Sequence, residues 1–115
     1  MMEEMEQRFS LGAFDLMIML ALMRLDEPAY GVPIAREIED ASGQVVAVAT
    51  LYAALARLEK KGLISSQLGE PTAERGGRAK RYFRVTARGL REVRDAQRVF
   101  ISLWQGVPKL KGGVA

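Results

Sequence analysis

Cysteine and histidine, two of the residues that most often take part in catalysis and metal binding, are absent from this 115-residue sequence. Their absence excludes disulfide frameworks, thiolate zinc sites, histidine-based metal or proton-transfer sites, and nucleophiles activated by histidine. Asp, Glu, Lys and Tyr are able to catalyse reactions, but no motif arranges them for it. We therefore expect no enzyme activity, no metal and no cofactor, and the basic side chains become the candidates for function.

Basic charge is concentrated in the second part of the chain. Residues 1–42 hold nine acidic and three basic side chains, whereas residues 43–115 hold five acidic and fourteen basic ones. The two segments thus carry −6 and +9 within a net charge of +3. Such a segment favours a polyanionic partner, with nucleic acid as the first hypothesis and an anionic membrane surface as its competitor.

A helix predicted over residues 47–61 positions the first basic group. Leu51, Leu55 and Leu58 recur at helical spacing and form its buried stripe, which Val48 extends one turn back. Gly62 ends the helix.

The opposite face of this helix carries small, hydroxyl and basic side chains, namely Ala49, Thr50, Ala53, Arg57 and Lys60. Ala49 and Ala53 would let the helix approach the floor of a DNA major groove and meet thymine methyl groups. Thr50 is able to bond a base or a phosphate, and the fork of Arg57 suits guanine or phosphate. An ordinary surface helix with solvated Lys and Arg is the alternative. Because base-reading side chains are few, we also expect indirect readout of groove width.

A second basic group lies on a predicted hairpin, with strands over residues 63–68 and 80–85 and a polar loop between them. Its basic side chains are Arg75, Arg78, Lys80, Arg81 and Arg84, against the acidic Glu70 and Glu74. Gly76 and Gly77 at the tip leave a backbone free of bulk, able to lie close to a phosphate or enter a minor groove. The hairpin therefore indicates a DNA-binding wing.

Further helices complete the arrangement. They are predicted over residues 10–25, apolar on nearly all sides, over 32–41, and over 87–105 with Thr86 as N-cap. The fold class is mainly α with a small β-hairpin: a winged helix-turn-helix plus a C-terminal dimerisation helix. We divide the chain into an N-terminal arm (1–9), a DNA-binding domain (10–86), a dimerisation helix (87–107) and a flexible tail (108–115).

The last helix carries an apolar seam that this small domain cannot easily cover. On a seven-residue repeat the seam consists of Leu90, Val93, Gln97, Phe100, Trp104 and Val107. Another copy of the same helix would offer a matching surface, so we expect a homodimer.

Trp104, the only tryptophan, has two interpretations. It is part of the packed dimer seam, or two symmetry-related Trp104 rings border a cavity for a flat aromatic or hydrophobic effector. In the second interpretation Phe100, Met17 and Met23 assist.

The sequence resembles the PadR family of transcriptional regulators, and looks like its shorter subgroup with one C-terminal dimerisation helix. The resemblance covers about residues 11–90, and its markers are Leu11-Gly12, Tyr30-Gly31, Thr50-Leu51-Tyr52 followed by Leu55, Arg57-Leu58-Glu59, Gly62-Leu63-Ile64, Gly76-Gly77-Arg78, Lys80-Arg81-Tyr82-Phe83, and Thr86 with Gly89.

This resemblance implies a homodimeric repressor that binds a pseudo-palindromic operator in double-stranded DNA and is released by a small effector or another signal. It implies that Thr50, Tyr52 and Arg57 meet the operator, and that Arg75, Arg78, Lys80 and Arg81 serve the wing. Tyr52 lies at the flank of its helix, so a phosphate contact and a packing role under the hairpin both remain open. One departure is that no Ser, Thr, Asp or Asn precedes the helix as a cap.

We expect a cytoplasmic protein that does not enter a membrane, because the acidic N-terminus is unlike a secretory signal and the longest apolar run is short. Two rival functions remain. One is a membrane-surface protein using the arginines of the last helix, Arg88, Arg91, Arg94 and Arg98, with the seam. The other is a winged-helix adaptor that binds a protein, for which retention of the basic wing is unexpected.

Overall fold

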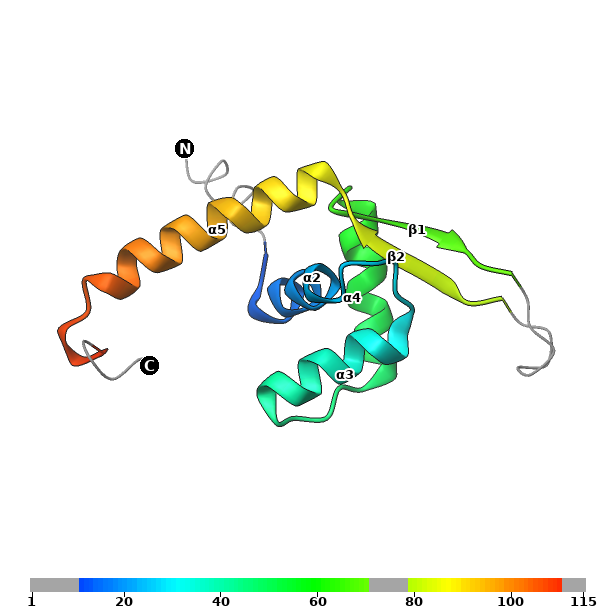
Figure 1. Cartoon of the computed structure of the whole chain (residues 1–115), viewed down its shortest axis with the longest axis horizontal. Coiled ribbons are helices and arrows are strands. Elements are labelled where there is room, and N and C mark those ends of the chain that lie inside the picture. The colour runs from blue at the N-terminus through cyan, green and yellow to red at the C-terminus, as the bar shows by residue number, and fades with distance from the viewer. Residues whose placement is uncertain (1–10, 71–78, 111–115) are drawn as a thin grey trace.

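A computed structural model gives the arrangement of the elements and describes residues 11–70 and 79–110. In chain order the elements are α2 (Ala13–Leu25), α3 (Gly31–Ser42), α4 (Val48–Lys60), β1 (Ile64–Leu68), β2 (Arg81–Val85), α5 (Ala87–Gln105) and the 3-10 turn η2 (Pro108–Leu110). Three helices form a unit, the β1–β2 hairpin extends from one side of it, and α5 projects from the other (Figure 1). The predicted winged helix-turn-helix with an added C-terminal helix is confirmed.

The core forms where the apolar stripes of α2, α3 and α4 meet. Ile18 of α2, Ile34 of α3, and Leu51 and Leu55 of α4 are each at most 1% exposed and belong to one cluster. The part of the predicted stripe formed by Leu51, Leu55 and Leu58 is therefore confirmed. Burying these side chains supplies the main stabilising term of so small a domain.

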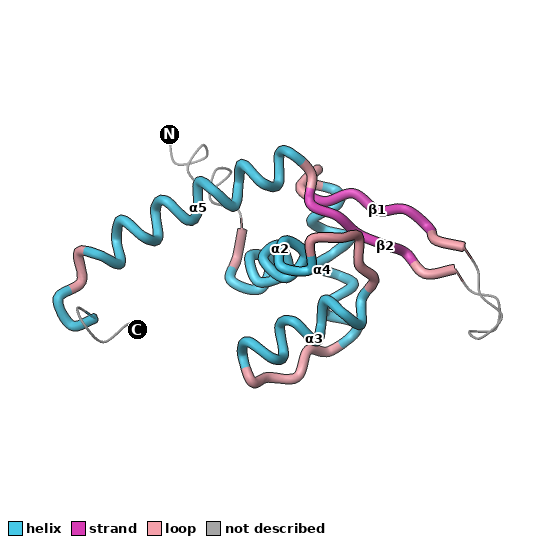
Figure 2. Tube along the Cα trace, in the orientation of Figure 1, coloured by secondary structure: helices cyan, strands magenta, loops and turns pink. Residues whose placement is uncertain are grey.

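The hairpin is a two-stranded antiparallel sheet (Figure 2). Its register pairs Ile64 with Val85 and Leu68 with Arg81. Phe83 of β2 points into the core. Its backbone also bonds the linker between α2 and α3, with Ala29 N donating to Phe83 O at 3.0 Å and Phe83 N donating to Ala29 O at 2.8 Å. This bridge attaches the wing to the helical unit, as a two-stranded sheet requires.

The first turn of α5 is fastened to the end of α4. Thr86 caps the helix as predicted, because its hydroxyl accepts a hydrogen bond from Gly89 N at 3.0 Å, and it also donates to Gly62 O at 2.8 Å. Beyond this attachment the helix leaves the domain, and the described chain reaches a length of 56 Å. From Gln97 to Lys109 every residue is exposed.

Several boundaries differ from the prediction. The first helix begins at Ala13 and not at residue 10, with Gly12 as N-cap in extended geometry. Val48, placed in the buried stripe, is 67% exposed because it occupies the first turn of α4, beyond the reach of the core. Residues 108–110, predicted as part of a flexible tail, form a 3-10 turn after Gly106.

Candidate nucleic-acid interface

The start of α4 is fixed by a carboxylate from the preceding helix. The N-cap residue Ala47 offers no side-chain acceptor. One residue earlier, Val46 N donates to Oε2 of Glu39 at 2.7 Å. The chain turns between the helices at Gly43, whose φ of 72° suits glycine. Glu39 thus holds the segment that leads into α4. The sequence did not indicate this role, because Glu39 belongs to the preceding helix and is not adjacent to the start of α4.

The exposed face of α4 contains every side chain that the sequence assigned to it. Ala49, Thr50, Tyr52, Ala53, Arg57 and Lys60 are all exposed, and Val48 and Ala56 join them. All residues of α4 are described, and Glu59 is its one acidic side chain. Glu59 is half-buried and accepts a hydrogen bond from Ser66 Oγ at 2.5 Å. The exposed face therefore combines small apolar side chains with basic ones, a composition that suits the base edges and the phosphates of a major groove.

Arg57 has a partner that the sequence analysis did not identify. Its Nη2 lies 2.7 Å from Oδ1 of Asp15, which is the only buried charged side chain among the described residues. The Asp15 carboxylate raises the pKa of Arg57, mainly because it accepts this hydrogen bond and also through Coulomb attraction. The pair joins α2 to α4. A lone aspartate within the apolar run of residues 11–25 was the available signal.

Tyr52 lies against the first turn of α3. A Cβ added to Gly31 would lie 2.5 Å from Oη and 2.8 Å from Cζ of Tyr52, so the ring occupies the space that only a glycine leaves. Tyr52 is still exposed on its other side. Tyr52 therefore packs on Gly31 with one side of its ring, and the phosphate contact and the packing under the hairpin both stay predictions.

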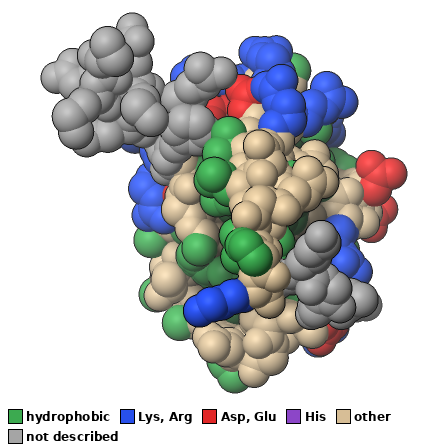
Figure 3. All heavy atoms as spheres, turned by 90° about the vertical axis from the view of Figure 1, so that its left-hand side faces the viewer, with side chains coloured by type: hydrophobic (Ala, Val, Ile, Leu, Met, Phe, Trp, Pro, Cys, Tyr) green, Lys and Arg blue, Asp and Glu red, His purple; other side chains and the backbone are tan. Residues whose placement is uncertain are grey.

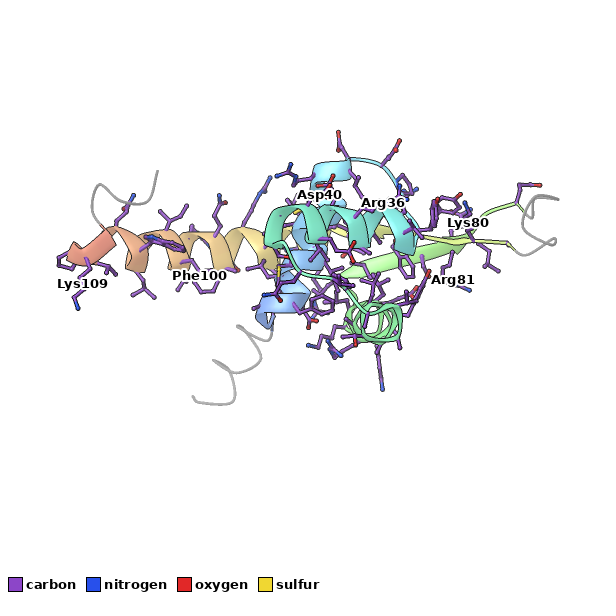
Figure 4. The ribbon with its side chains drawn as sticks, turned by 90° about the horizontal axis from the view of Figure 1, so that it is seen from below. Arg36, Asp40, Lys80, Arg81, Phe100 and Lys109 are labelled. Atoms are coloured by element: carbon purple, nitrogen blue, oxygen red, sulfur yellow. The ribbon has the colours of Figure 1, made fainter. Side chains whose placement is uncertain are left out.

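Two basic residues at the loop end of β2 are held in different ways. The ammonium of Lys80 sits 3.8 Å above the ring centroid of Tyr30, which meets Tyr82 edge to face. Arg81 Nη1 donates to Ser66 Oγ at 2.9 Å on the side of the hairpin that faces α4. In Figure 4, Lys80 and Arg81 lie near the loop end of the strands, far from Lys109 beyond α5. The tip residues Arg75, Gly76, Gly77 and Arg78 lie outside the described residues.

A groove of about 1020 Å³ lies between α2 and α5 and is mostly apolar. Its lining includes all six predicted seam residues, Leu90, Val93, Gln97, Phe100, Trp104 and Val107, together with Leu16, Leu20 and Met23 of α2. Hydrophobic side chains reach the surface on the side of the molecule toward which α5 projects (Figure 3). Of the four residues assigned to an effector site, Met23, Phe100 and Trp104 line this groove, whereas Met17 is exposed outside it.

Other kinds of site find no support within the described ranges 11–70 and 79–110. No group of three His, Cys, Asp or Glu side chains in them is arranged to hold a metal ion. None of the described helices is both long enough and apolar enough to cross a membrane.

The sequence matches the profile of the transcriptional regulator PadR-like family over residues 19–95. A PadR-family transcriptional regulator from Eggerthella lenta is 31% identical, with a TM-score of 0.67 over 96% of this chain and 89% of its own. A PadR-like transcription factor from Bacteroides fragilis is 26% identical, with a TM-score of 0.74 over 93% and 98%. A transcriptional regulator from Clostridium thermocellum is 29% identical, with a TM-score of 0.66 over 83% and 86%. No curated protein sequence is significantly similar to the chain.

Proposed function

The chain belongs to the PadR-like family of transcriptional regulators, and from this premise we propose that it is a homodimeric repressor of a pseudo-palindromic operator. It works in the cytoplasm, where it meets the chromosome. The observation that carries the proposal is the exposed face of α4, which combines small side chains with Arg57 and Lys60 and has the basic wing beside it.

Each subunit places α4 in a major groove and its wing against the flanking minor groove. Because Arg57 is bonded to Asp15, we assign it to a phosphate and not to guanine, since the pair restricts the movement of its fork. Lys60, Lys80 and Arg81 add further phosphate contacts. The role of Arg75, Arg78, Gly76 and Gly77 in the minor groove rests on the sequence.

The DNA contact is tested by footprinting the region upstream of the protein's own gene and then titrating that duplex. We expect Arg57→Ala to weaken all bound sequences alike and to reduce the slope of log affinity against log salt by about one. Lys109→Ala, which removes an equal charge at the far end of α5 (Figure 4), is the matched control and should leave the slope unchanged. An unchanged slope in Arg57→Ala would remove this residue from the DNA.

Dimerisation is proposed to occur through the groove between α2 and α5. The side chains of Phe100 and Trp104 are each 52% exposed, although both are large and apolar, and a second copy of α5 would cover them. The double variant Phe100→Glu/Trp104→Glu is expected to sediment as a monomer at concentrations where the wild type is a dimer. Val32→Glu changes another exposed apolar residue, on α3, and should stay dimeric. A monomeric wild type would refute this part of the proposal.

The groove is also the proposed effector site, with Trp104, Phe100 and Met23 around a flat hydrophobic compound. Met17 takes part only if the dimer brings it to the groove of the partner. Since Trp104 is the only tryptophan, its fluorescence reports directly on binding. Aromatic compounds that release the operator should quench it; release without any change in fluorescence would leave Trp104 as a packing residue only.

The proposal that the protein is a repressor predicts the direction of regulation as well as the binding of DNA. Deleting the gene should raise transcription from the footprinted promoter, and supplying the protein again should lower it. A fall in transcription on deletion would show activation instead.

A further inference from the structure

The turn and first residues of α4 present apolar side chains that the described part of the protein does not cover. Val45 is 92% exposed and Val48 is 67% exposed, and the small side chains of Ala49 and Ala53 are exposed farther along the helix. These two exposed valines, three residues apart, keep apolar surface in water and so add little to the stability of the fold. Their place at the leading end of the DNA-facing helix suggests a role in contact with the partner.

This surface is held in place. Between the two valines, Val46 faces inward against the core cluster and donates its N–H to Glu39 at 2.7 Å. Val45 and Val48 therefore flank an anchored residue, and their outward direction is set by the fold. A surface fixed in this way is suited to shape-specific contact, because little conformational entropy is lost on binding.

Few polar side chains of α4 are placed to recognise bases. Arg57 is bonded to Asp15, and Tyr52 has its hydroxyl beside Gly31. Lys60 stands at the last residue of the helix, three turns beyond Val48. Thr50 is the remaining short polar side chain on the exposed face. A reader of guanine would use a free Arg or Lys near the start of the helix, and α4 has none there.

We propose that Val45, Val48, Ala49 and Ala53 form a thymine-reading patch, which recognises the C5-methyl groups of thymines in the major groove of each operator half-site. The thymine methyl is the apolar group at the base edges of that groove, and it matches an apolar patch on the protein. The inference rests on the proposed DNA-binding function and specifies what part of the base is read.

The probe is DNA in which thymine is replaced by uracil, which removes only the methyl group and keeps the base pair. Sites are first selected from random duplexes with the full-length protein and are expected to contain A·T pairs at the half-site centre. Resynthesis with uracil at one such position should weaken binding about three- to fourfold, as expected for loss of one buried methyl contact. Narrowing of the minor groove, the main alternative source of a preference for A·T pairs, does not depend on this methyl.

The variant Val48→Ala identifies the protein side of the contact. Val48 is exposed, so the fold should survive the change, and the variant should lose affinity for thymine DNA while discriminating less between thymine and uracil. Val32→Ala, at an exposed valine on α3, is the matched control and should keep the full discrimination.

The outcomes separate the patch from the proposed function. Selective binding that is indifferent to uracil at every half-site position would overturn the patch and leave the DNA-binding function intact. Failure to select or bind any duplex would overturn both. Equal discrimination by Val48→Ala and wild type would exclude Val48 as the reader and refute the proposal as stated.

Discussion

Gly89, in the first turn of α5, lies where this helix meets the three-helix unit, and replacing it by alanine should displace α5 from that unit. A Cβ at this position would lie 2.8 Å from Cε of Met19 and 3.0 Å from the carbonyl carbon of Leu63, and closer still to the carbonyl oxygen. The methionine end is able to move aside, but the backbone of Leu63 is not, because its oxygen accepts the N–H of Thr86 at 3.1 Å. The helix must therefore shift.

The cost follows from what that shift disturbs. Overpacking against fixed atoms costs about 1–3 kcal/mol. Moving α5 also weakens two hydrogen bonds that Thr86 makes to Gly62 O and Leu63 O, at about 1 kcal/mol each. Alanine returns up to about 1 kcal/mol as a better helix former. We expect Gly89→Ala to lower the free energy of unfolding by about 2–4 kcal/mol, or the Tm by roughly 8–16 °C.

The assay is urea unfolding followed by circular dichroism at one fixed protein concentration, because the stability of the proposed dimer would depend on concentration. Gly106→Ala is the matched control on the same helix: its added Cβ would meet only Leu103 O, at an ordinary 3.6 Å, and its φ of −84° suits alanine. We expect this control to stay within about 0.5 kcal/mol of wild type. If Gly89→Ala is as stable as the control, the close approach of α5 to Leu63 is wrong.

Three further predictions concern side chains that hold elements together. Glu39→Ala should lower the free energy of unfolding by about 1 kcal/mol, because Val46 N loses its acceptor, whereas Glu39→Gln keeps an oxygen and should retain most of the stability in urea titrations. Asp15→Asn removes the charge opposite Arg57. Because Arg57 already contributes its phosphate contact in the wild type, the salt slope for DNA binding should steepen by less than about one, and the preference for the selected site should fall; an unchanged slope would contradict the pairing. Thr86→Ala should cost about 1–2 kcal/mol in thermal unfolding, with Thr86→Ser as the variant that keeps the cap.

Much of the fold was predictable because apolar periodicity reports burial directly. The stripe of Leu51, Leu55 and Leu58 predicted both the helix and its buried face, and Thr86 marked the start of the last helix. Helix starts were less accurate where no side chain caps them, as at Gly12 and Ala47. Val48 was misplaced because periodicity gives a direction around the helix but does not tell how far along it the core extends.

The sequence by itself determined which residues lie on each face of α4 and α5 and where basic charge is concentrated, because these depend on local spacing. Only the tertiary structure decided which of these side chains have partners within the protein. Asp15 is 42 residues from Arg57 along the chain. Only the crossing of α2 and α4 brings the two side chains together and gives the guanidinium of Arg57 a partner within the protein. The bonding of Glu39 to Val46 and of Ala29 to Phe83 likewise depends on chain packing that no local pattern records.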